Sequence, residues 1–459
     1  MNPEPTLLWA PRAWIGGRWW DAVLLGIGAD GHWLEVTAGV AAPPAANLLP
    51  GPVLPGMVNA HSHAFQRAFA GLAERRTGGQ DDFWAWRDRM YAVALRIDPG
   101  QLRAVAAQLY AELLHGGYTQ VCEFHYLQHA PDGRPYADPL TLSWALADAA
   151  ADTGIGLTVL PVLYERAGFR ESVLRDDQRR FATSAESVLR MQRALRESRR
   201  PELRAGVAIH SLRAASPESI RRLLASVEDI PIHIHVAEQT AEVDESFAAT
   251  GARPIDWLAR HVALDARWHL VHATHSTTAE IAAVASAGAG VVLCPSTEAN
   301  LGDGLTDVPG WLAAGVSLSI GSDSQVTRGW AEELRLLEYG QRLERRQRNV
   351  AAAPDQGEPS TAARLTSCTL AGGASAAGFA RWGLEAGARA DLLVIDTADT
   401  GVIGVPASHL LDALVFSSPG RPFRDVMVGG RWVIRDHQLP RSAEIANRFT
   451  ESMGALWPA

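Results

Sequence analysis

The sequence predicts an α/β fold, a (β/α)8 TIM barrel with a small β-sandwich domain formed by both ends of the chain. Two observations predict it. In the middle of the chain, short apolar runs alternate with alanine- and leucine-rich stretches of helical character, and at both ends strand-like runs are separated by glycine turns. Strands that alternate with helices form parallel sheets, whereas successive strands joined by tight turns form antiparallel sheets. The length of 459 residues suits one large barrel with an added domain.

Both ends of the chain have the pattern of antiparallel β structure. The segments with strand character are 7–15, 23–28 and 32–36 near the start, and 390–395, 425–428 and 431–434 near the end. Glycine pairs at positions 16–17 and 429–430 supply turns between strands. Because the two ends have the same character, we expect them to pair into one small domain. We therefore assign residues 1–55 and 376–459 to the sandwich and residues 56–375 to the barrel.

The middle of the chain contains eight candidate strands. They cover residues 57–63, 120–126, 157–163, 203–210, 232–237, 269–273, 290–294 and 316–322. Helical periodicity between them is clearest over residues 99–114, 142–151, 217–226 and 279–286. Eight βα units in roughly 320 residues suit a TIM barrel with insertions. An open doubly wound sheet is the alternative, but no glycine-rich dinucleotide fingerprint lies between an expected strand and an expected helix.

The composition narrows the possible functions. The net charge is −9, and all 42 basic residues are arginine. The absence of lysine excludes a lysine Schiff base, the lysine of a nucleotide-binding P-loop and a metal centre bridged by a modified lysine. The acidic balance argues against binding to a nucleic acid backbone or to an anionic membrane surface.

Neither a signal peptide nor a transmembrane segment is expected. The N-terminal residues lack a basic start followed by an apolar run, and no stretch of about 18 residues is continuously apolar. The cysteines, Cys122, Cys294 and Cys368, are far apart and odd in number, which fits a reducing compartment better than a disulfide framework. We therefore expect a cytoplasmic protein. Cys294 is interpreted as a small core residue and not as a nucleophile.

Histidines stand at the C-terminal ends of the expected barrel strands, where TIM-barrel active sites lie. His61 and His63 end the first strand, and residues two apart on a strand share a face. His235 ends the fifth strand and Asp323 ends the eighth. Nitrogen ligands with one carboxylate suit zinc, although iron or manganese can occupy the same kind of site. Histidines scattered through a core would not fall selectively at these ends, so we expect a divalent metal centre.

Two further side chains are placed for proton transfer. His272 ends the sixth strand, with His269 and His275 as nearby alternatives, and Glu238 lies three residues after the histidine of the fifth strand. His272 could hydrogen-bond an attacking water, Asp323 could accept its proton, and Glu238 could protonate a departing nitrogen. The alternative for Glu238 is a solvated carboxylate at the start of a helix.

The histidine pair on strand one, the histidines on strands five and six and the aspartate on strand eight resemble the amidohydrolase superfamily. Members often build a β-sandwich from both chain ends, and the segment GLEAGARADLLVID is similar to the one that re-enters that sandwich. Many binuclear members use a carboxylated lysine, so the absence of lysine implies the mononuclear layout or another bridge. By this resemblance one zinc ion per subunit is held by His61, His63, His235 and Asp323.

A series of longer motifs narrows the resemblance to one deiminase branch of the superfamily. They occur along the barrel in the order HSHAFQRAFAGLAE, FWAWR, EFHYLQH, HSLRA, HIHVAEQ, LVHATH, STEANLGDG and GSDSQV. The branch implies hydrolysis of N-formimidoyl-L-glutamate to N-formyl-L-glutamate and ammonia in bacterial histidine degradation. It also implies a homodimer. In this reading Glu238, His272 and Asp323 are the catalytic residues.

The implied substrate is a small molecule with two carboxylates, which call for arginine because its planar guanidinium matches a carboxylate. The resemblance assigns substrate binding to Gln66, Arg87, Tyr126, His210 and Arg213. Arg89 competes with Arg87 in the same segment, and which arginine meets which carboxylate stays open. The loop of residues 297–304, with Glu298 and Asp303, either lines the pocket mouth or forms a structural turn.

Two alternatives remain. One is another mononuclear aminohydrolase, acting on a purine, a triazine or a guanidino acid. A pocket for one of these substrates needs fewer groups that bind carboxylates. The presence of both Arg87 and Arg213 therefore favours the dicarboxylate substrate over these alternatives. The other alternative is a catalytically silent barrel that serves as an assembly scaffold. The expected metal ligands, together with Glu238 and His272, are all present in the sequence, which argues against a scaffold.

Overall fold

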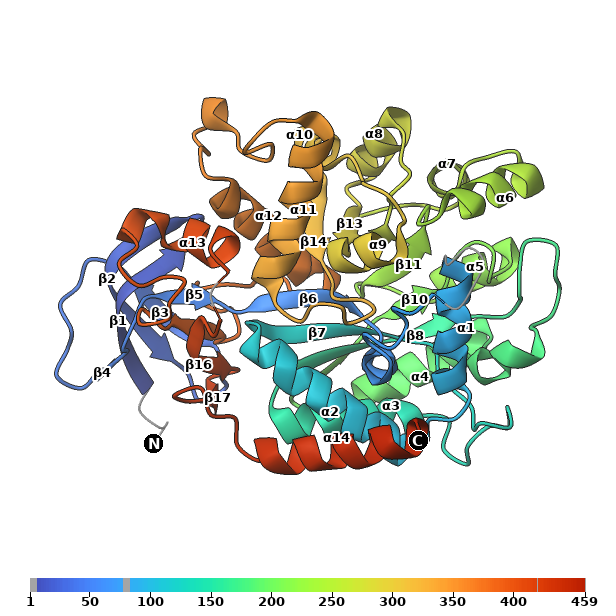
Figure 1. Ribbon diagram of the computed structural model, residues 1–459, viewed down its shortest axis with the longest axis horizontal. Helices are drawn as coiled ribbons and strands as arrows, with labels where there is room; N and C mark the ends of the chain where they lie inside the picture. Colours follow the sequence, from blue (N-terminus) through green and yellow to red (C-terminus); the bar gives the residue numbers. More distant parts are fainter. Residues whose placement is uncertain (1–5, 77–82, 419, 459) are drawn as a thin grey trace.

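A barrel of parallel strands forms the centre of the computed structural model, which describes residues 6–76, 83–418 and 420–458 (Figure 1). Its strands are β6 (Met57–Ser62), β7 (Tyr118–His125), β8 (Gly156–Leu163), β10 (Val207–Ile209), β11 (Ile232–Val236), β12 (Trp268–His272), β13 (Gly290–Leu293) and β14 (Ser317–Ile320). Their order in the sheet is their order in the chain, and neighbouring strands are parallel. The TIM barrel expected from the sequence is confirmed.

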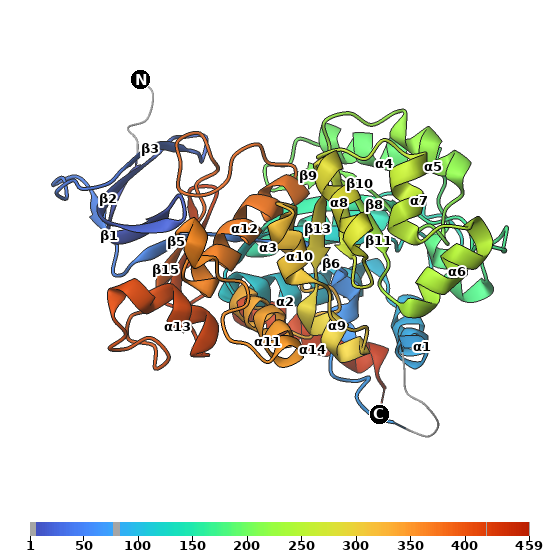
Figure 2. The same cartoon turned by 90° about the horizontal axis from the view of Figure 1, so that it is seen from above.

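Helices cover the outside of the barrel (Figures 1 and 2). They are α2 (Pro99–His115), α3 (Thr141–Thr153), α4 (Ala185–Glu197), α5 (Pro217–Leu224), α6 (Thr240–Thr250), α7 (Pro254–His261), α8 (Thr278–Ala287), α9 (Pro295–Leu301), α10 (Val308–Ala313), α11 (Trp330–Arg345) and α12 (Thr361–Ala376). The start of α2 shows why a helix begins at this point in the sequence. Asp98 accepts a hydrogen bond from the N–H of Gln101 at 2.8 Å, and Pro99 occupies the first helical position. The four expected helices coincide with α2, α3, α5 and α8.

The barrel closes where β14 meets β6. The backbone N–H of Asp323 donates to the carbonyl of His61 at 3.0 Å, and the N–H of His63 donates to the carbonyl of Asp323 at 3.3 Å. Gly321 makes this approach possible, because a Cβ there would lie 2.6 Å from Cβ of His61. The closure brings together side chains that are far apart in the sequence.

The fourth strand differs from the single run expected over residues 203–210. A short strand β9 (Leu203–Ala205) pairs with β8, and the chain resumes as β10 after Gly206. A Cβ at Gly206 would lie 2.6 Å from the carbonyl oxygen of Pro231, so the backbone passes too close to its neighbour for a side chain. The interruption therefore reflects tight packing against the fifth strand.

The two chain ends form a separate sheet. Its strands are β1 (Thr6–Ile15), β2 (Arg18–Ile27), β3 (Trp33–Thr37), β4 (Asn47–Leu48), β5 (Val53–Pro55), β15 (Leu392–Ile395), β16 (Phe423–Val428) and β17 (Arg431–Ile434). Strand β5 joins the two ends, because it pairs parallel with β1 and antiparallel with β15. Leu8, Val23, Trp33, Leu392 and Met427 belong to one buried apolar cluster, so both parts of the sheet enclose a common core. The expected domain made from both termini is confirmed.

The C-terminal region also contributes two helices that pack on the barrel. Helix α13 (Leu410–Phe416) packs on α11 and α12, and α14 (Ser442–Leu456) packs along α2 (Figure 1). The indole N–H of Trp457 donates to the carbonyl of Ala68 at 2.8 Å, which anchors the segment after β6. The domain boundaries near residues 55 and 376 stay a prediction. Among the described residues, no helix combines the length and apolar character needed to cross a membrane.

Candidate active site

Four candidate metal ligands converge at the C-terminal end of the barrel. His61 lies in β6 and His63 just beyond it, His235 lies in β11, and Asp323 follows β14. The Nε2 atom of His61 lies 3.2 Å from Nε2 of His63 and 3.0 Å from Nε2 of His235. Oδ1 of Asp323 lies 3.5 Å from Nε2 of His61 and 3.3 Å from Nε2 of His63. Strands one, five and eight thus direct their donor atoms at one point.

This donor set fits a metal ion. Ligand atoms around a tetrahedral zinc lie about 3.4 Å apart, given metal–ligand bonds of about 2.0–2.2 Å. A neutral imidazole carries a single ring proton, so Nε2 of His61 cannot satisfy both neighbouring Nε2 atoms by hydrogen bonding. Nδ1 of His63 donates to the carbonyl of Phe124 at 2.9 Å, which leaves the lone pair of its Nε2 facing the other donors.

The electrostatics of the ligands agree with metal binding. Burial lowers the pKa of His61 to about 3, so its ring stays neutral and its nitrogen is available as a ligand. Burial alone would raise the pKa of the Asp323 carboxyl, but the hydrogen bond from His61 and the surrounding histidines together hold that pKa well below its usual range. The carboxylate is therefore ionised at neutral pH.

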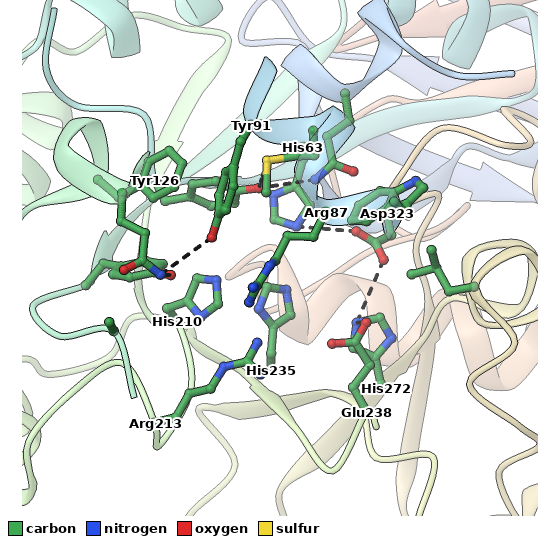
Figure 3. A pocket seen from close by; sticks show the side chains of 18 residues that line it. His63, Arg87, Tyr91, Tyr126, His210, Arg213, His235, Glu238, His272 and Asp323 are labelled. Atoms are coloured by element: carbon green, nitrogen blue, oxygen red, sulfur yellow. Dashed lines mark hydrogen bonds and ion pairs between the residues drawn. The ribbon is translucent and has the colours of Figure 1, made fainter. Parts of the chain in front are cut away.

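Two groups suited to proton transfer lie beside the ligands. Nε2 of His272, the last residue of β12, lies 3.7 Å from Oε1 of Glu238 and 3.7 Å from Oδ2 of Asp323. Burial raises the pKa of Glu238 to about 7, so this carboxyl can hold a proton at neutral pH. Burial lowers the pKa of His272, but Glu238, Glu298 and Asp323 together outweigh this effect and raise that pKa to about 10. Figure 3 shows the three side chains together on one side of the pocket.

Glu298 is buried behind His272. Its Oε1 lies 3.3 Å from Nδ1 of His272 and accepts a hydrogen bond from the backbone N–H of Cys294 at 2.9 Å. A carboxylate on Nδ1 directs the other ring nitrogen, Nε2, toward Glu238 and Asp323. The segment 297–304, expected as a loop, belongs mostly to helix α9; it supports a residue of the site through Glu298 and lines the pocket through Leu301. Burial raises the pKa of the Cys294 thiol, which agrees with its interpretation as a core residue.

Left-handed backbone turns mark the ends of three barrel strands. The φ angle is +52° at Ala237, +69° at His272 and +43° at Asp323. Residues other than glycine adopt this conformation at a cost of about 1–3 kcal/mol, and they do so where the surrounding structure holds them. At these positions the chain leaves its strand while the side chains of His272 and Asp323 point into the pocket (Figure 3).

A pocket extends from the metal donors and contains every side chain expected to bind substrate (Figure 3). These are Gln66, Arg87, Tyr126, His210 and Arg213. Arg87 comes from α1 (Phe83–Ala94), and Arg213 comes from the loop after β10. The amide of Gln66 donates to the hydroxyl of Tyr126 at 3.1 Å. Burial and the charge of Arg213 lower the pKa of His210 well below its usual value, so His210 is neutral.

The structure places Arg87 and His272 differently from the alternatives weighed beside them. Arg89 donates to the carbonyls of Leu72 and Arg75 at 3.2 and 2.7 Å, and it does not line the pocket, whereas Arg87 does. His269 packs against His233 with ring centroids 5.0 Å apart, on a face that does not line the pocket. His275 does not line the pocket either.

Sequence reasoning missed three polar side chains of the pocket wall: Tyr91, Tyr164 and Gln178. Tyr164 follows directly on β8, so its place at the C-terminal end of a barrel strand was a usable signal. Tyr91 belongs to α1, four residues after Arg87 and therefore on the same face of that helix. Gln178 lies in a 3-10 helix, η2 (Asp176–Phe181), within a long connection that carries no recognisable motif.

The chain is similar to known proteins over most of its length. The model of the amidohydrolase family matches residues 53–433. Formimidoylglutamate deiminase from Pseudomonas aeruginosa is 47% identical over 453 residues, covering 98% of this chain and 99% of that protein. The crystal structure of an amidohydrolase from Brucella melitensis has a TM-score of 0.93 at 41% identity, covering 98% of this chain and 99% of that one. An adenosine deaminase from Xanthomonas campestris, solved with bound zinc, has a TM-score of 0.80 at 22% identity over 99% of both chains.

The barrel and its buried histidine and aspartate donors have the architecture of a metal-dependent hydrolase. The family model covers most of the chain, and the Pseudomonas protein matches it from end to end. The chain belongs to the amidohydrolase family.

Proposed function

We propose that the protein hydrolyses N-formimidoyl-L-glutamate to N-formyl-L-glutamate and ammonia, with one zinc ion per subunit. One observation carries the proposal: a single pocket combines a metal donor set with Glu238 and with the guanidinium groups of Arg87 and Arg213. A dicarboxylate that contains a hydrolysable amidine carbon needs all of these groups. The 47% identity to formimidoylglutamate deiminase supports the same substrate.

His61, His63, His235 and Asp323 would hold the zinc ion. When bound, it supplies an activated water and a Lewis acid. Iron or manganese suits the same nitrogen and oxygen donors, so metal analysis of the purified protein must accompany any activity measurement.

The chain's own residues move the protons. Attack by water forms a C–O bond at the formimino carbon, and Asp323, assisted by His272, takes up the water proton. As the C=N π bond opens, Glu238 protonates the terminal nitrogen. In the breakdown step the carbon-bound hydroxyl gives its proton back to Glu238, Asp323 passes its proton to the nitrogen, the C–N bond breaks, and ammonia leaves as the formyl C=O forms. The pKa of about 7 for Glu238 lets it give up a proton and regain one at neutral pH.

Arg87 and Arg213 would bind the carboxylates, because guanidinium pairs with carboxylate by charge-assisted hydrogen bonds. Gln66, Tyr126 and His210 complete the substrate-binding wall in this proposal. His210 is neutral and so adds hydrogen bonding without charge.

The test is ammonia release from N-formimidoyl-L-glutamate by the zinc-loaded protein, with N-formimidoyl-L-aspartate and guanine as competitors of different length and class. Turnover of the glutamate compound alone supports the proposal. Turnover of guanine instead would favour a purine aminohydrolase. No turnover with zinc bound, on any of the three, would remove the substrate assignment and leave the hydrolase fold.

We further propose that the enzyme acts in the cytoplasm, in histidine degradation, as a homodimer. The cysteines are free, and Cys122 and Cys294 are buried, which is compatible with a reducing compartment. Light scattering on the purified protein measures the oligomeric state directly, and a monomer mass would contradict the dimer.

A further inference from the structure

The amide group of Gln178 has a fixed orientation in the wall of the pocket. Its Oε1 accepts a hydrogen bond from the backbone N–H of Arg175 at 3.1 Å. A backbone N–H can only donate, so the amide oxygen must face Arg175 and the NH2 group must face the opposite way. Gln178 is almost fully buried, at 1% exposed, so solvent does not compete for these positions.

The NH2 group of Gln178 faces two tyrosine hydroxyls. Its Nε2 lies 2.9 Å from the hydroxyl oxygen of Tyr164 and 3.5 Å from that of Tyr91. Nη2 of Arg175, which can also only donate, lies 3.5 Å from the hydroxyl oxygen of Tyr91. Both tyrosine oxygens therefore act as acceptors in these contacts, and their protons must point elsewhere.

The protons of the two hydroxyls are left for the pocket. Within the described part of the chain, neither hydroxyl donates to a protein acceptor. Both side chains line the same pocket as Arg87 and Arg213, and Figure 3 shows Tyr91 beside Arg87. Burial raises the pKa of Tyr164, so this hydroxyl keeps its proton at neutral pH. This part of the pocket thus presents donors from two guanidinium groups and two hydroxyls.

We infer that Tyr91 and Tyr164 donate hydrogen bonds to the substrate carboxylate that the pocket arginines bind, and that Gln178 sets this donor polarity. The inference rests on the proposed function and deepens it. Arg175 contributes by fixing the amide of Gln178 and by donating to Tyr91.

An all-donor subsite discriminates a carboxylate from a carboxamide. A carboxylate has only acceptor positions, so it satisfies every donor around it. The NH2 group of a carboxamide would face tyrosine O–H and guanidinium N–H groups and find no acceptor, and leaving buried polar groups unpaired carries a large penalty. The enzyme should therefore discriminate against the monoamide whose carboxamide occupies this subsite, and Tyr91 and Tyr164 should determine that selectivity.

Two variants test the inference from opposite directions. Tyr164→Phe removes one donor, and we expect KM for N-formimidoyl-L-glutamate to rise about tenfold with kcat nearly unchanged. Gln178→Glu keeps both tyrosines and the bond from the Arg175 backbone but places a carboxylate oxygen before the hydroxyls, which would draw their protons away from the pocket. KM should rise at least as much in this variant.

The matched control removes a buried tyrosine hydroxyl elsewhere. Tyr118 begins β7, at the end of the barrel away from the site, and its hydroxyl is buried without a hydrogen-bond partner among the described residues. Tyr118→Phe should leave KM, kcat and the preference for a carboxylate over a carboxamide unchanged.

A second measurement needs no turnover. It is a calorimetric titration of the metal-loaded parent and variants with N-formyl-L-glutamate and with glutarate.

The outcomes separate the inference from the proposed function. Suppose that the parent enzyme turns over N-formimidoyl-L-glutamate, and that Tyr164→Phe and Gln178→Glu have the same KM as the parent. Suppose also that both variants prefer this substrate over its two monoamides, in which one carboxylate is a carboxamide, as strongly as the parent does. The inference is then wrong and the proposed function stands. If there is no turnover but both variants weaken glutarate binding about tenfold, the function fails and the subsite stands. A loss of kcat at constant KM in Tyr164→Phe would also overturn the inference.

Discussion

Asp323 and His61 are in contact through both their backbones and their side chains at the seam of the barrel, the place where β14 and β6 pair. The N–H of Asp323 donates to the carbonyl of His61 at 3.0 Å, and Oδ1 of Asp323 lies 3.5 Å from Nε2 of His61. The hydrogen bonds that close the barrel therefore also set the spacing of two candidate metal ligands. A change in the seam should alter stability and metal affinity together.

The substitution Gly321→Ala tests this coupling. The new Cβ would lie 2.6 Å from Cβ of His61 and 2.8 Å from its carbonyl oxygen, so the strands must separate. We expect the free energy of unfolding to fall by about 2 kcal/mol, measured by urea denaturation, and zinc affinity to fall with it. Gly454→Ala is the control, because a Cβ there meets no atom within 4 Å. A variant at Gly321 as stable as the parent would refute the steric argument.

Glu298→Gln should lower kcat about 10–100-fold, as expected for a residue that orients a functional histidine. The neutral amide keeps the shape but removes the charge beside Nδ1 of His272, which lies 3.3 Å away. Steady-state kinetics and zinc content measure the effect, and the metal should stay bound. The control Glu332→Gln removes a half-exposed carboxylate from α11 and should have no effect. An unchanged kcat in Glu298→Gln would mean that the carboxylate only stabilises the start of α9, where it accepts from the N–H of Cys294.

Arg213→Gln should raise KM for N-formimidoyl-L-glutamate by about 30-fold or more, because a charge-assisted hydrogen bond contributes about 2 kcal/mol. The effect on kcat should be smaller, since the proposed role of Arg213 is to bind a carboxylate and not to transfer a proton. Arg89→Gln is the matched control, because Arg89 bonds to the backbone outside the pocket. Equal KM values for the two variants would count against carboxylate binding by Arg213.

Glu333 should make stability depend on pH. Its buried carboxylate accepts hydrogen bonds from the N–H and hydroxyl of Ser296 at 2.9 and 2.6 Å, yet burial dominates and raises its pKa from 4.5 to about 7. Between these two values the folded state holds a proton that the unfolded state has released, so the free energy of unfolding falls as pH rises. The loss amounts to about 3 kcal/mol at most.

Urea denaturation of the parent and of Glu333→Gln at several values between pH 4.5 and 7.5 measures this slope. Because glutamine does not titrate, the variant should lose this part of the dependence. Replacing the neighbouring Glu332, which is half exposed, should leave the slope as it is. A parent and a Glu333 variant with the same slope would show that the carboxyl ionises normally in the folded protein.

Much of the fold and of the site could be predicted because both depend on local patterns. Apolar runs that alternate with helical periodicity predicted all eight barrel strands, and the ends of those strands carry the expected donors His61, His235 and Asp323. The residue type at a strand end and the direction in which it points both follow from a period of two. The interruption at Gly206 was not predictable, since it arises from contact with Pro231 on another segment.

The sequence by itself determined the barrel, the domain made from both chain ends and the kinds of side chain that surround the pocket. The tertiary structure alone showed what surrounds them: Glu298 behind His272, and Tyr91, Tyr164 and Gln178 in the pocket wall. It also decided the donor polarity around Gln178, which depends on a backbone N–H and two tyrosines from separate segments. Periodicity along the chain specifies which face a residue occupies, whereas a hydrogen-bond partner is specified only when distant segments pack together.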